Sequence, residues 1–318
     1  MFITRTREGF SPALRSMRTT SLHRLNGDRP LGAFGKVTYF ACNWLNNLFP
    51  HASVDSRLTI RNFQSANLAE AWPRLETGAS PSRKLSDLFW MALPWAAIER
   101  ELGSIHVLDI GCGSGEYGPR LLSWSGHRIT SYVGLDVRAH EKWGPLAAAN
   151  PQLTFMRGDS SDVGASVPPR TNLFISQSAI EHIDDDLLLF ERLRDYEQRF
   201  SGRVLHVHVC PSAACLKLFL LHGVRHYTPR TLSKITRLYD GNHAAVLFNL
   251  GGNACNRLHY EFITRPRFPN RTSDFRDTRT AEYNHRAFDA ITQDMNEPTR
   301  SPAFYALVVC GNFGRPLF

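Results

Sequence analysis

Short apolar runs alternate with longer amphipathic stretches through most of this chain. The runs predict strands at 105–110, 131–137, 153–157, 172–177, 203–209, 244–250 and 303–310. Helical or irregular stretches near 116–124, 141–149, 161–167 and 185–200, and a helix at 229–239, separate them. Short strands that are apolar throughout, joined by helices, are typical of a parallel sheet covered on both faces. The pattern therefore predicts an α/β fold.

The N-terminal part has a different pattern. Residues 1–30 are rich in Arg, Ser, Thr and Pro, and we expect them to be flexible. Residues 31–49 carry apolar and aromatic side chains at helical spacing and end before Pro50, which predicts a helix that packs on the rest of the chain. Another helix is expected at 85–102, divided at Pro94.

These patterns divide the chain into two parts. We expect a basic N-terminal extension at 1–84, partly flexible and partly helical. The main domain is expected at 85–318, with an insertion at about 251–300.

Charge is concentrated in the extension. The 318 residues carry a net charge of +8, and 12 Lys and Arg against five Asp and Glu lie in residues 1–84. A basic arm suits nucleic acid, anionic lipid or an anionic substrate, and a solvated extension without a partner is an equal alternative. The fractions of apolar residues, 42%, and of charged residues, 21%, are those of an ordinary globular protein.

The cysteines and the apolar runs indicate the compartment. Six cysteines are scattered without a C-x-x-C pair, which predicts neither a disulfide framework nor a zinc site. No run reaches the length of a signal peptide or of a membrane helix, which needs about 20 apolar residues. We expect a cytoplasmic protein without a membrane span.

A glycine-rich turn follows the first predicted strand of the main domain. Asp109 ends the apolar run, and Gly111, Gly113 and Gly115 alternate with small residues before a predicted helix. Glycine has no Cβ, so the backbone can adopt positive φ and a ligand can approach the main chain closely. The free N–H groups of the next helix add partial positive charge there. The turn predicts a nucleotide-type pocket at the carboxyl end of a parallel strand.

Two further carboxylates end the next two strands. Asp136 ends one, and Asp159 follows Gly158 at the end of the other. In a doubly wound sheet these strand ends lie along one crevice. Asp136 can accept hydrogen bonds from a ribose diol and Asp159 from an adenine amine. Asp109 faces the glycine turn and can either accept from a ligand ammonium group or hold the turn in place.

A dinucleotide site is the main rival interpretation. Gly113-Ser114-Gly115-Glu116-Tyr117-Gly118 matches G-x-G-x-x-G, and Asp136 lies about twenty residues further on. The glycine turn begins earlier than that fingerprint requires, at Gly111, and a pyrophosphate gains nothing from a nearby carboxylate. The carboxylates favour a zwitterionic amino-acid group instead.

Together, Asp109-Ile-Gly111-x-Gly113-x-Gly115, Gly134-Leu-Asp136, Gly158-Asp159 and Ile180-Glu181-His182-Ile183 resemble the class I S-adenosylmethionine-dependent methyltransferases. Within this family the chain is most similar to the branch that acts on small molecules and sugars. The resemblance covers about residues 85–250, with a last strand near 303–310. It implies a Rossmann-like doubly wound seven-stranded sheet, mostly parallel with an antiparallel last strand, and S-adenosyl-L-methionine as the cofactor.

The family pattern also implies the cofactor-binding residues. These are Asp109, Gly111, Cys112, Gly113, Gly115, Asp136, Val137, Asp159, Ser160 and Gln177. By this resemblance the glycine turn would line the methionine and ribose part, Val137 would lie against adenine, and Gln177 would border the sulfonium and the substrate. For Ser160 and Gln177, ordinary loop hydrogen bonding stays an alternative.

Glu181-His182 is similar to the Glu-His pair that follows the fourth strand in many such enzymes. His182 is the predicted catalytic residue, because an imidazole with an ordinary pKa near 6.5 suits a general base. Helix capping by the nearby acids is the alternative, as is a divalent cation on Glu181, His182 and Asp184–Asp186. Methyl transfer from a sulfonium does not require a metal, and we assign none.

Two other groups of histidines remain. His206 and His208 alternate on a predicted strand, and packing in the core is the favoured interpretation. His222, Arg225, His226 and Tyr227 lie in a loop on the carboxyl side of the sheet, and they are the predicted substrate residues for a polyhydroxylated or anionic acceptor.

These observations predict a methyltransferase for a small-molecule or sugar acceptor, including a precursor of surface polysaccharide. One alternative is a nucleic-acid or protein methyltransferase that uses the basic arm. Another is a cofactor-binding subunit without catalysis that activates a partner. The sequence does not indicate the oligomeric state.

Overall fold

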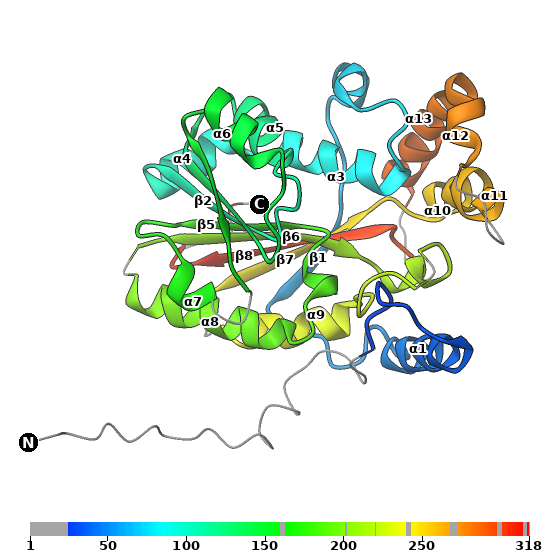
Figure 1. Ribbon diagram of the computed structural model, residues 1–318, viewed down its shortest axis with the longest axis horizontal. Coiled ribbons are helices and arrows are strands. Elements are labelled where there is room, and N and C mark those ends of the chain that lie inside the picture. Colours follow the sequence, from blue (N-terminus) through cyan, green and yellow to red (C-terminus); the bar gives the residue numbers. More distant parts are fainter. Residues whose placement is uncertain are drawn as a thin grey trace, which may run out of the picture.

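One mixed sheet of eight strands forms the centre of the computed structural model, in the order β1-β7-β8-β6-β5-β2-β3-β4 (Figure 1). The structure describes residues 25–159, 163–200, 202–219, 221–239, 243–267, 273–297, 301–313 and 317. The strands are β1 (Leu58–Asn62), β2 (Ile105–Ile110), β3 (Ile129–Asp136), β4 (Leu153–Arg157), β5 (Leu173–Gln177), β6 (Val204–Pro211), β7 (Ala244–Leu250) and β8 (Phe304–Gly311).

The strand directions confirm the predicted Rossmann-like α/β architecture. Strands β4, β3, β2, β5 and β6 run parallel to one another, and β8 runs antiparallel to both β6 and β7. All seven strands expected from the sequence are present, including the antiparallel last strand.

The sheet has one strand more than the seven expected. Strand β1 comes from the N-terminal extension and pairs in parallel with β7 at the edge of the sheet. Of its five residues Leu58 is buried and the other four are exposed. An edge strand that buries only one side chain needs no apolar run, so the sequence pattern did not predict it.

Helices cover both faces of the sheet (Figure 1). One face carries α3 (Pro81–Ala92), α4 (Trp95–Leu102), α5 (Tyr117–Trp124) and α6 (Trp143–Ala149), and the other carries α7 (Val163–Ser166), α8 (Asp186–Arg199) and α9 (Pro229–Thr236). Two apolar cores result. Trp90 of α3 and Leu121 of α5 belong to the first, and Phe190 of α8 and Leu232 of α9 belong to the second.

The remaining elements lie outside this frame. They are α1 (Ala33–Asn46), α2 (Leu68–Ala71), η2 (Trp72–Arg74), η4 (Ile180–His182), η5 (Ala213–Lys217), α10 (Asn253–His259), η6 (Tyr260–Thr264), α11 (Arg265–Arg267), α12 (Phe275–Thr278) and α13 (Thr280–Asn296). The last five fill the predicted insertion. Among the described residues, no helix has both the length and the apolar character that crossing a membrane requires.

Helix α1 packs through a different face than its apolar pattern suggests. It buries Tyr39, Asn43 and Asn46, whereas Phe34 is 85% exposed and Trp44 is 60% exposed. The polar face turns inward because it hydrogen-bonds backbone groups: Tyr39 Oη donates to the carbonyl of His222 at 2.7 Å, and Asn43 Nδ2 donates to that of Val224 at 3.4 Å. The helix therefore supports the loop that carries His222.

Candidate functional site

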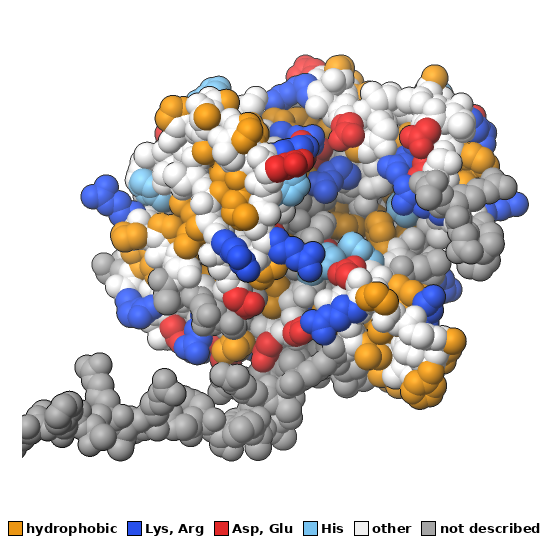
Figure 2. Space-filling model, viewed as in Figure 1, with side chains coloured by type: hydrophobic (Ala, Val, Ile, Leu, Met, Phe, Trp, Pro, Cys, Tyr) orange, Lys and Arg blue, Asp and Glu red, His pale blue; other side chains and the backbone are white. Residues whose placement is uncertain are grey.

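Two cavities lie side by side at the carboxyl edge of the parallel strands. Their volumes are about 600 and 540 Å³, and Gly111, Ser178 and His182 line both. The order β5-β2-β3-β4 brings the ends of these four strands together at this edge. Figure 2 shows a hollow in the middle of this face, with histidine and charged side chains around it. We call these two spaces the first cavity and the second cavity.

The glycine turn after β2 is shaped by two close approaches. Gly111 has φ +75°, and a Cβ there would lie 2.5 Å from Cβ of Ala179. Gly115 has φ +81°, and a Cβ there would lie 2.4 Å from the Phe155 ring. Gly111 and Gly113 line the cavities. Gly115 is not among the lining residues, so its lack of a side chain serves the packing of the turn on β4.

Asp109 lines the second cavity and is buried. Its Oδ2 accepts a hydrogen bond of 2.5 Å from Tyr132 Oη, while Oδ1 has no partner among the described residues. Burial raises the pKa of this carboxyl to about 7, the charge of Asp136 adds to that rise, and the Tyr132 hydroxyl opposes it. A buried carboxyl oxygen without a partner is costly unless a ligand satisfies it.

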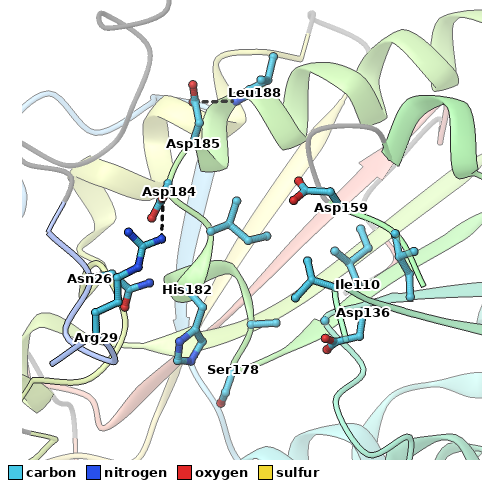
Figure 3. Close-up of a pocket in the computed structure, with 16 residues that line it drawn as sticks. Asn26, Arg29, Ile110, Asp136, Asp159, Ser178, His182, Asp184, Asp185 and Leu188 are labelled. Atoms are coloured by element: carbon cyan, nitrogen blue, oxygen red, sulfur yellow. Dashed lines mark hydrogen bonds and ion pairs between the residues drawn. The ribbon is translucent and has the colours of Figure 1, made fainter. Parts of the chain in front are cut away.

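The other predicted strand-end residues line the first cavity. Asp136 accepts from the N–H of Gly113 at 2.9 Å, and Val137 is half exposed. Figure 3 shows the Asp136 and Asp159 carboxylates at the same cavity, beside Ile110. Ser160, the remaining predicted residue here, lies outside the described residues.

Cys112 and Gln177 line the second cavity, as does Arg83 of α3. Gln177 Oε1 accepts from the indole N–H of Trp90 at 2.7 Å, and its Nε2 donates to Ser178 Oγ at 3.3 Å. Burial is the largest of the effects that raise the pKa of Cys112, so its thiol stays protonated. The sequence analysis did not identify Arg83 as a cavity residue. Arg83 lies in the first turn of α3, where its backbone N–H donates to the capping side chain of Ser80.

His182 lies where the two cavities meet, and an N-terminal residue fixes its orientation. Its Nδ1 is 2.5 Å from Oδ2 of Asp28, and its Nε2 is 3.9 Å from Oε1 of Glu181. Partial burial acts to raise the pKa of Asp28, but hydrogen bonds from Gly223 and His182 outweigh it and lower that pKa. Asp28 is therefore an ionised acceptor, to which Nδ1 of His182 donates.

Sequence reasoning also missed the part that the N-terminal segment plays. Asn26 and Arg29 line the first cavity opposite Asp136, as Figure 3 shows. Gly27 N donates to the carbonyl of Gly223 at 2.6 Å, which pairs this segment with the loop after η5. The segment Asn26-Gly27-Asp28-Arg29 is polar throughout, so the sequence alone does not distinguish it from a solvated arm.

Of the four predicted substrate residues, the structure places one beside a cavity. His222 lines the second cavity and faces the His182 ring, with the ring centroids 4.8 Å apart. Arg225, His226 and Tyr227 are fully buried. This corrects the placement expected from the sequence, in which all four face an acceptor.

The physical reason is a buried polar cluster. Arg225 donates to the carbonyls of Ile183 at 2.6 Å and Asp184 at 2.7 Å and lies 3.4 Å from the carboxylate of Asp186. Tyr227 Oη donates to the same carboxylate at 2.9 Å. These side chains hold the loop against η4 and the start of α8.

The acids after His182 have structural contacts of their own. Asp185 caps α8 by accepting from the N–H of Leu188 at 3.2 Å, and Asp184 faces Arg29 at 3.9 Å (Figure 3). The capping alternative is thus confirmed for Asp185. His206 and His208 are fully buried on β6, as the packing interpretation expected.

No protein-family model and no curated protein matches the sequence. Among solved structures, the plantazolicin methyltransferase BamL, in complex with a triazolic desmethylPZN analog and SAH, is 12% identical and covers 78% of this chain and 91% of its own, with a TM-score of 0.46.

Two further similar structures are S-adenosylmethionine-dependent methyltransferases. The one from Mesorhizobium loti is 14% identical, with 70% of this chain and 97% of that chain covered and a TM-score of 0.43. The one from Archaeoglobus fulgidus is 17% identical, with 69% and 94% covered and a TM-score of 0.39. All three TM-scores lie below 0.5 and all three identities below 25%, so these similarities assign no function.

Proposed function

We propose that this chain is an S-adenosylmethionine-dependent methyltransferase that acts on a small-molecule or sugar acceptor. The observation that carries the proposal is the set of three carboxylates, Asp109, Asp136 and Asp159, at the ends of β2, β3 and β4 beside two joined cavities. Three carboxylates repel a pyrophosphate, whereas the ammonium, ribose hydroxyls and amine of an adenosyl amino acid are all donors. When bound, this cofactor supplies a methyl group on a sulfonium, which is already activated for transfer.

The chain's residues fit such a group. Oδ1 of Asp109, which has no hydrogen-bond partner in the described part of the chain, can accept from the ammonium. The guanidinium of Arg83 in the same cavity can pair with the carboxylate of that amino acid. Asp136 and Asp159 would hold the ribose and the adenine in the first cavity. The volumes of both cavities are in the range of sites that enclose small ligands, about 300 to 1,000 Å³.

His182 is assigned to the acceptor. It lines both cavities, so it lies where the methyl donor and the acceptor would meet. With its proton on Nδ1 and held by Asp28, its Nε2 lone pair is directed away from Asp28. An oriented lone pair can take the proton of a hydroxyl as the hydroxyl attacks the methyl group. The protein otherwise contributes alignment and exclusion of water.

The room for an acceptor continues beyond the second cavity. A third cavity of about 460 Å³ shares Ser80, Phe219 and His222 with it. Arg267 and Arg276 of the insertion line this space, and both pair with Asp274 at 2.9 Å. Aromatic, hydroxyl and guanidinium groups together suit a polyhydroxylated acceptor with limited negative charge.

Calorimetric titration of the purified full chain with S-adenosylhomocysteine tests the proposal. We expect one site per chain, and we expect Asp136→Ala to weaken binding at least about 10-fold, because the ribose loses a carboxylate acceptor. Exposed Asp289→Ala, on the outer face of α13, is the matched control and should change nothing. Absence of binding to the unmodified chain would refute the proposal.

The acceptor is sought by incubating the chain with labelled S-adenosylmethionine and cell fractions. Label in small-molecule or glycan material supports the acceptor class that we propose. Label in RNA or protein would instead support the alternative that uses the basic arm.

A further inference from the structure

Three metal-ligating side chains converge next to the proposed acceptor site. Ligand atoms of Glu181, His182 and His222 all lie within 4.8 Å of one another. Ligand atoms about 2 Å from one tetrahedral ion lie about 3.3 Å apart, so small side-chain rotations bring these three atoms into coordinating positions. The set is drawn from η4 and from the loop after η5, two segments that are about 40 residues apart in the sequence.

Glu181 is the member of this set that most needs a partner. It is fully buried, and neither of its carboxyl oxygens has a hydrogen-bond partner among the described residues. Its Oε1 points toward His182, 3.9 Å from Nε2. A buried carboxyl with both oxygens unsatisfied costs free energy of folding, and a cation would repay that cost.

His182 already has the orientation of a metal ligand. Its Nδ1–H is held by the Asp28 carboxylate at 2.5 Å, which leaves Nε2 on the side of Glu181. A carboxylate on the distal nitrogen of a histidine ligand is the usual arrangement around protein-bound zinc, since it fixes the tautomer and strengthens the donor nitrogen. Asp28 Oδ1 also lies 3.7 Å from Nδ1 of His222, so the same carboxylate lies beside both imidazoles.

The loop that carries His222 is built to approach Glu181. Gly223 has φ +64°, and a Cβ there would lie 2.9 Å from the carbonyl oxygen of Glu181. Val224 N donates to that same carbonyl at 2.6 Å, and Tyr39 Oη holds the carbonyl of His222. These contacts place the His222 ring beside Glu181, with ligand atoms of the two side chains within 4.8 Å of each other.

We propose that Glu181, His182 and His222 bind one divalent ion of the zinc type, with Asp28 holding His182 in place. Two imidazoles and one carboxylate suit Zn²⁺ and its first-row neighbours better than Mg²⁺ or Ca²⁺, which prefer oxygen ligands alone. The proposed ligands differ from the acidic set considered from the sequence, because Asp185 and Asp186 are engaged in capping and in the Arg225 cluster.

Three protein ligands leave a coordination position for the acceptor. His222 and His182 both line the second cavity, so a hydroxyl that enters there reaches this position. A divalent ion lowers the pKa of such a hydroxyl, which then releases its proton to water. The oxygen forms the new C–O bond, and the methyl–sulfur bond breaks with its electron pair left on sulfur. In this form of the enzyme the lone pair of His182 is a ligand and not a base. The inference rests on the proposed function for this last step alone.

Titration of the chelator-treated full chain with Zn²⁺, followed by calorimetry, tests the site without any need for turnover. We expect one ion per chain. His222→Asn and Glu181→Gln should each weaken Zn²⁺ binding about 100-fold, and Asp28→Asn about 10-fold, because outer-shell partners typically contribute 10- to 100-fold. Co²⁺ should give visible absorption bands in the unmodified chain that are lost in His222→Asn.

Asp184→Asn is the matched control, since Asp184 is a neighbouring acid that faces Arg29 instead of the cluster. It should bind Zn²⁺ like the unmodified chain. His222 is partly exposed, so its variant is expected to fold even if the Glu181 variant does not. Stoichiometric Zn²⁺ binding that is the same in His222→Asn as in the unmodified chain, or no binding at all, would overturn the inference.

A parallel titration with S-adenosylhomocysteine separates this inference from the proposed function. Cofactor binding without Zn²⁺ binding would refute the metal site and support the methyltransferase function. Zn²⁺ binding that depends on His222, without cofactor binding, supports the metal site and refutes the methyltransferase.

Discussion

At the scale of single residues, the most unusual groups of the site are the two buried carboxyls of Asp109 and Glu181. Each has a pKa of about 7 because burial penalises its ionised form, and each has at least one oxygen without a partner among the described residues. Both groups lower the stability of the fold when they ionise. Such costs are typical of positions kept for binding or catalysis.

The pKa of Asp109 predicts how cofactor affinity depends on pH. A ligand ammonium stabilises the ionised carboxylate, so binding releases a proton when the apo protein is protonated there. Between pH 6 and pH 8 the affinity for S-adenosylhomocysteine should rise about 10-fold, because the ionised fraction of one group with a pKa near 7 rises by that factor. Calorimetry across this range measures it. Asp109→Asn should bind weakly with no such rise; an equal rise in that variant would contradict the assignment.

The pKa of Glu181 predicts a stability effect with a defined sign. A carboxyl whose folded-state pKa is raised contributes stability that is present below its unfolded pKa and is lost as pH rises through about 7. In the presence of chelator, Glu181→Gln should therefore become more stable than the unmodified chain between pH 5 and pH 8. We expect a gain of about 3 kcal/mol at pH 8, measured by urea unfolding. A difference that does not change with pH would contradict it.

At the scale of elements, the site depends on segments that pack backbone to backbone. The pairing of residues 25–30 with residues 221–224 brings Asp28 to both histidines. A side chain at Gly27 would lie 2.5 Å from the backbone of Leu221, and one at Gly223 would lie 2.9 Å from that of Glu181. Helix α1 then holds the same loop through Tyr39 and Asn43.

Gly223→Ala tests this pairing, with Gly103→Ala as its control. Both glycines have positive φ, so alanine should cost about 1 kcal/mol of conformational strain at either position. A Cβ at residue 103 meets nothing within 4 Å, whereas one at residue 223 meets Glu181. We expect both variants to fold and Gly223→Ala to lose at least about 10-fold in methyl transfer, while Gly103→Ala keeps its activity. Equal activities of the two variants would show that the close contact between residue 223 and Glu181 does not affect methyl transfer.

At the scale of the whole molecule, the strand order decides where chemistry can occur. The ends of β2, β3, β4 and β5 meet at one edge, and η4 and the loop after η5 close that edge from the side of β6. Arg225 joins these parts, because it binds the carbonyls of Ile183 and Asp184 and pairs with Asp186 at the start of α8. We infer that this buried pair stabilises the frame of the site.

Arg225→Met should therefore destabilise the whole fold. The change leaves the Asp186 carboxylate buried without its cation, and breaking a buried ion pair in this way costs about 3 to 5 kcal/mol. Arg29→Ala is the control, because its pair with Asp184 is exposed and 3.9 Å long and should contribute less than about 1 kcal/mol. Urea unfolding of both variants measures the two costs; similar values would contradict the assigned role of Arg225.

The sequence by itself determined the elements of the main domain, because their signals are local. The apolar runs gave β2, β4 and β7 with the same bounds that the structure has, and the divided helix before β2 breaks at Pro94 as expected. The glycine turn and the acids that end β2 and β3 were likewise readable, since a residue at a strand end has its position fixed by the strand itself.

Tertiary structure decided everything that depends on contacts between distant segments. His222, Arg225 and His226 are polar residues of one loop, and nothing in the local sequence distinguishes their environments. In the structure His222 lines a cavity, whereas Arg225 and His226 are buried. Asp28, in a stretch with the composition of a solvated arm, lies against His182 because backbone hydrogen bonds from Gly27 and Gly223 bring the two segments together. Contacts of this kind arise from packing between segments that no local periodicity encodes, which is why the chain alone could name the strand-end carboxylates and not the residues that surround His182.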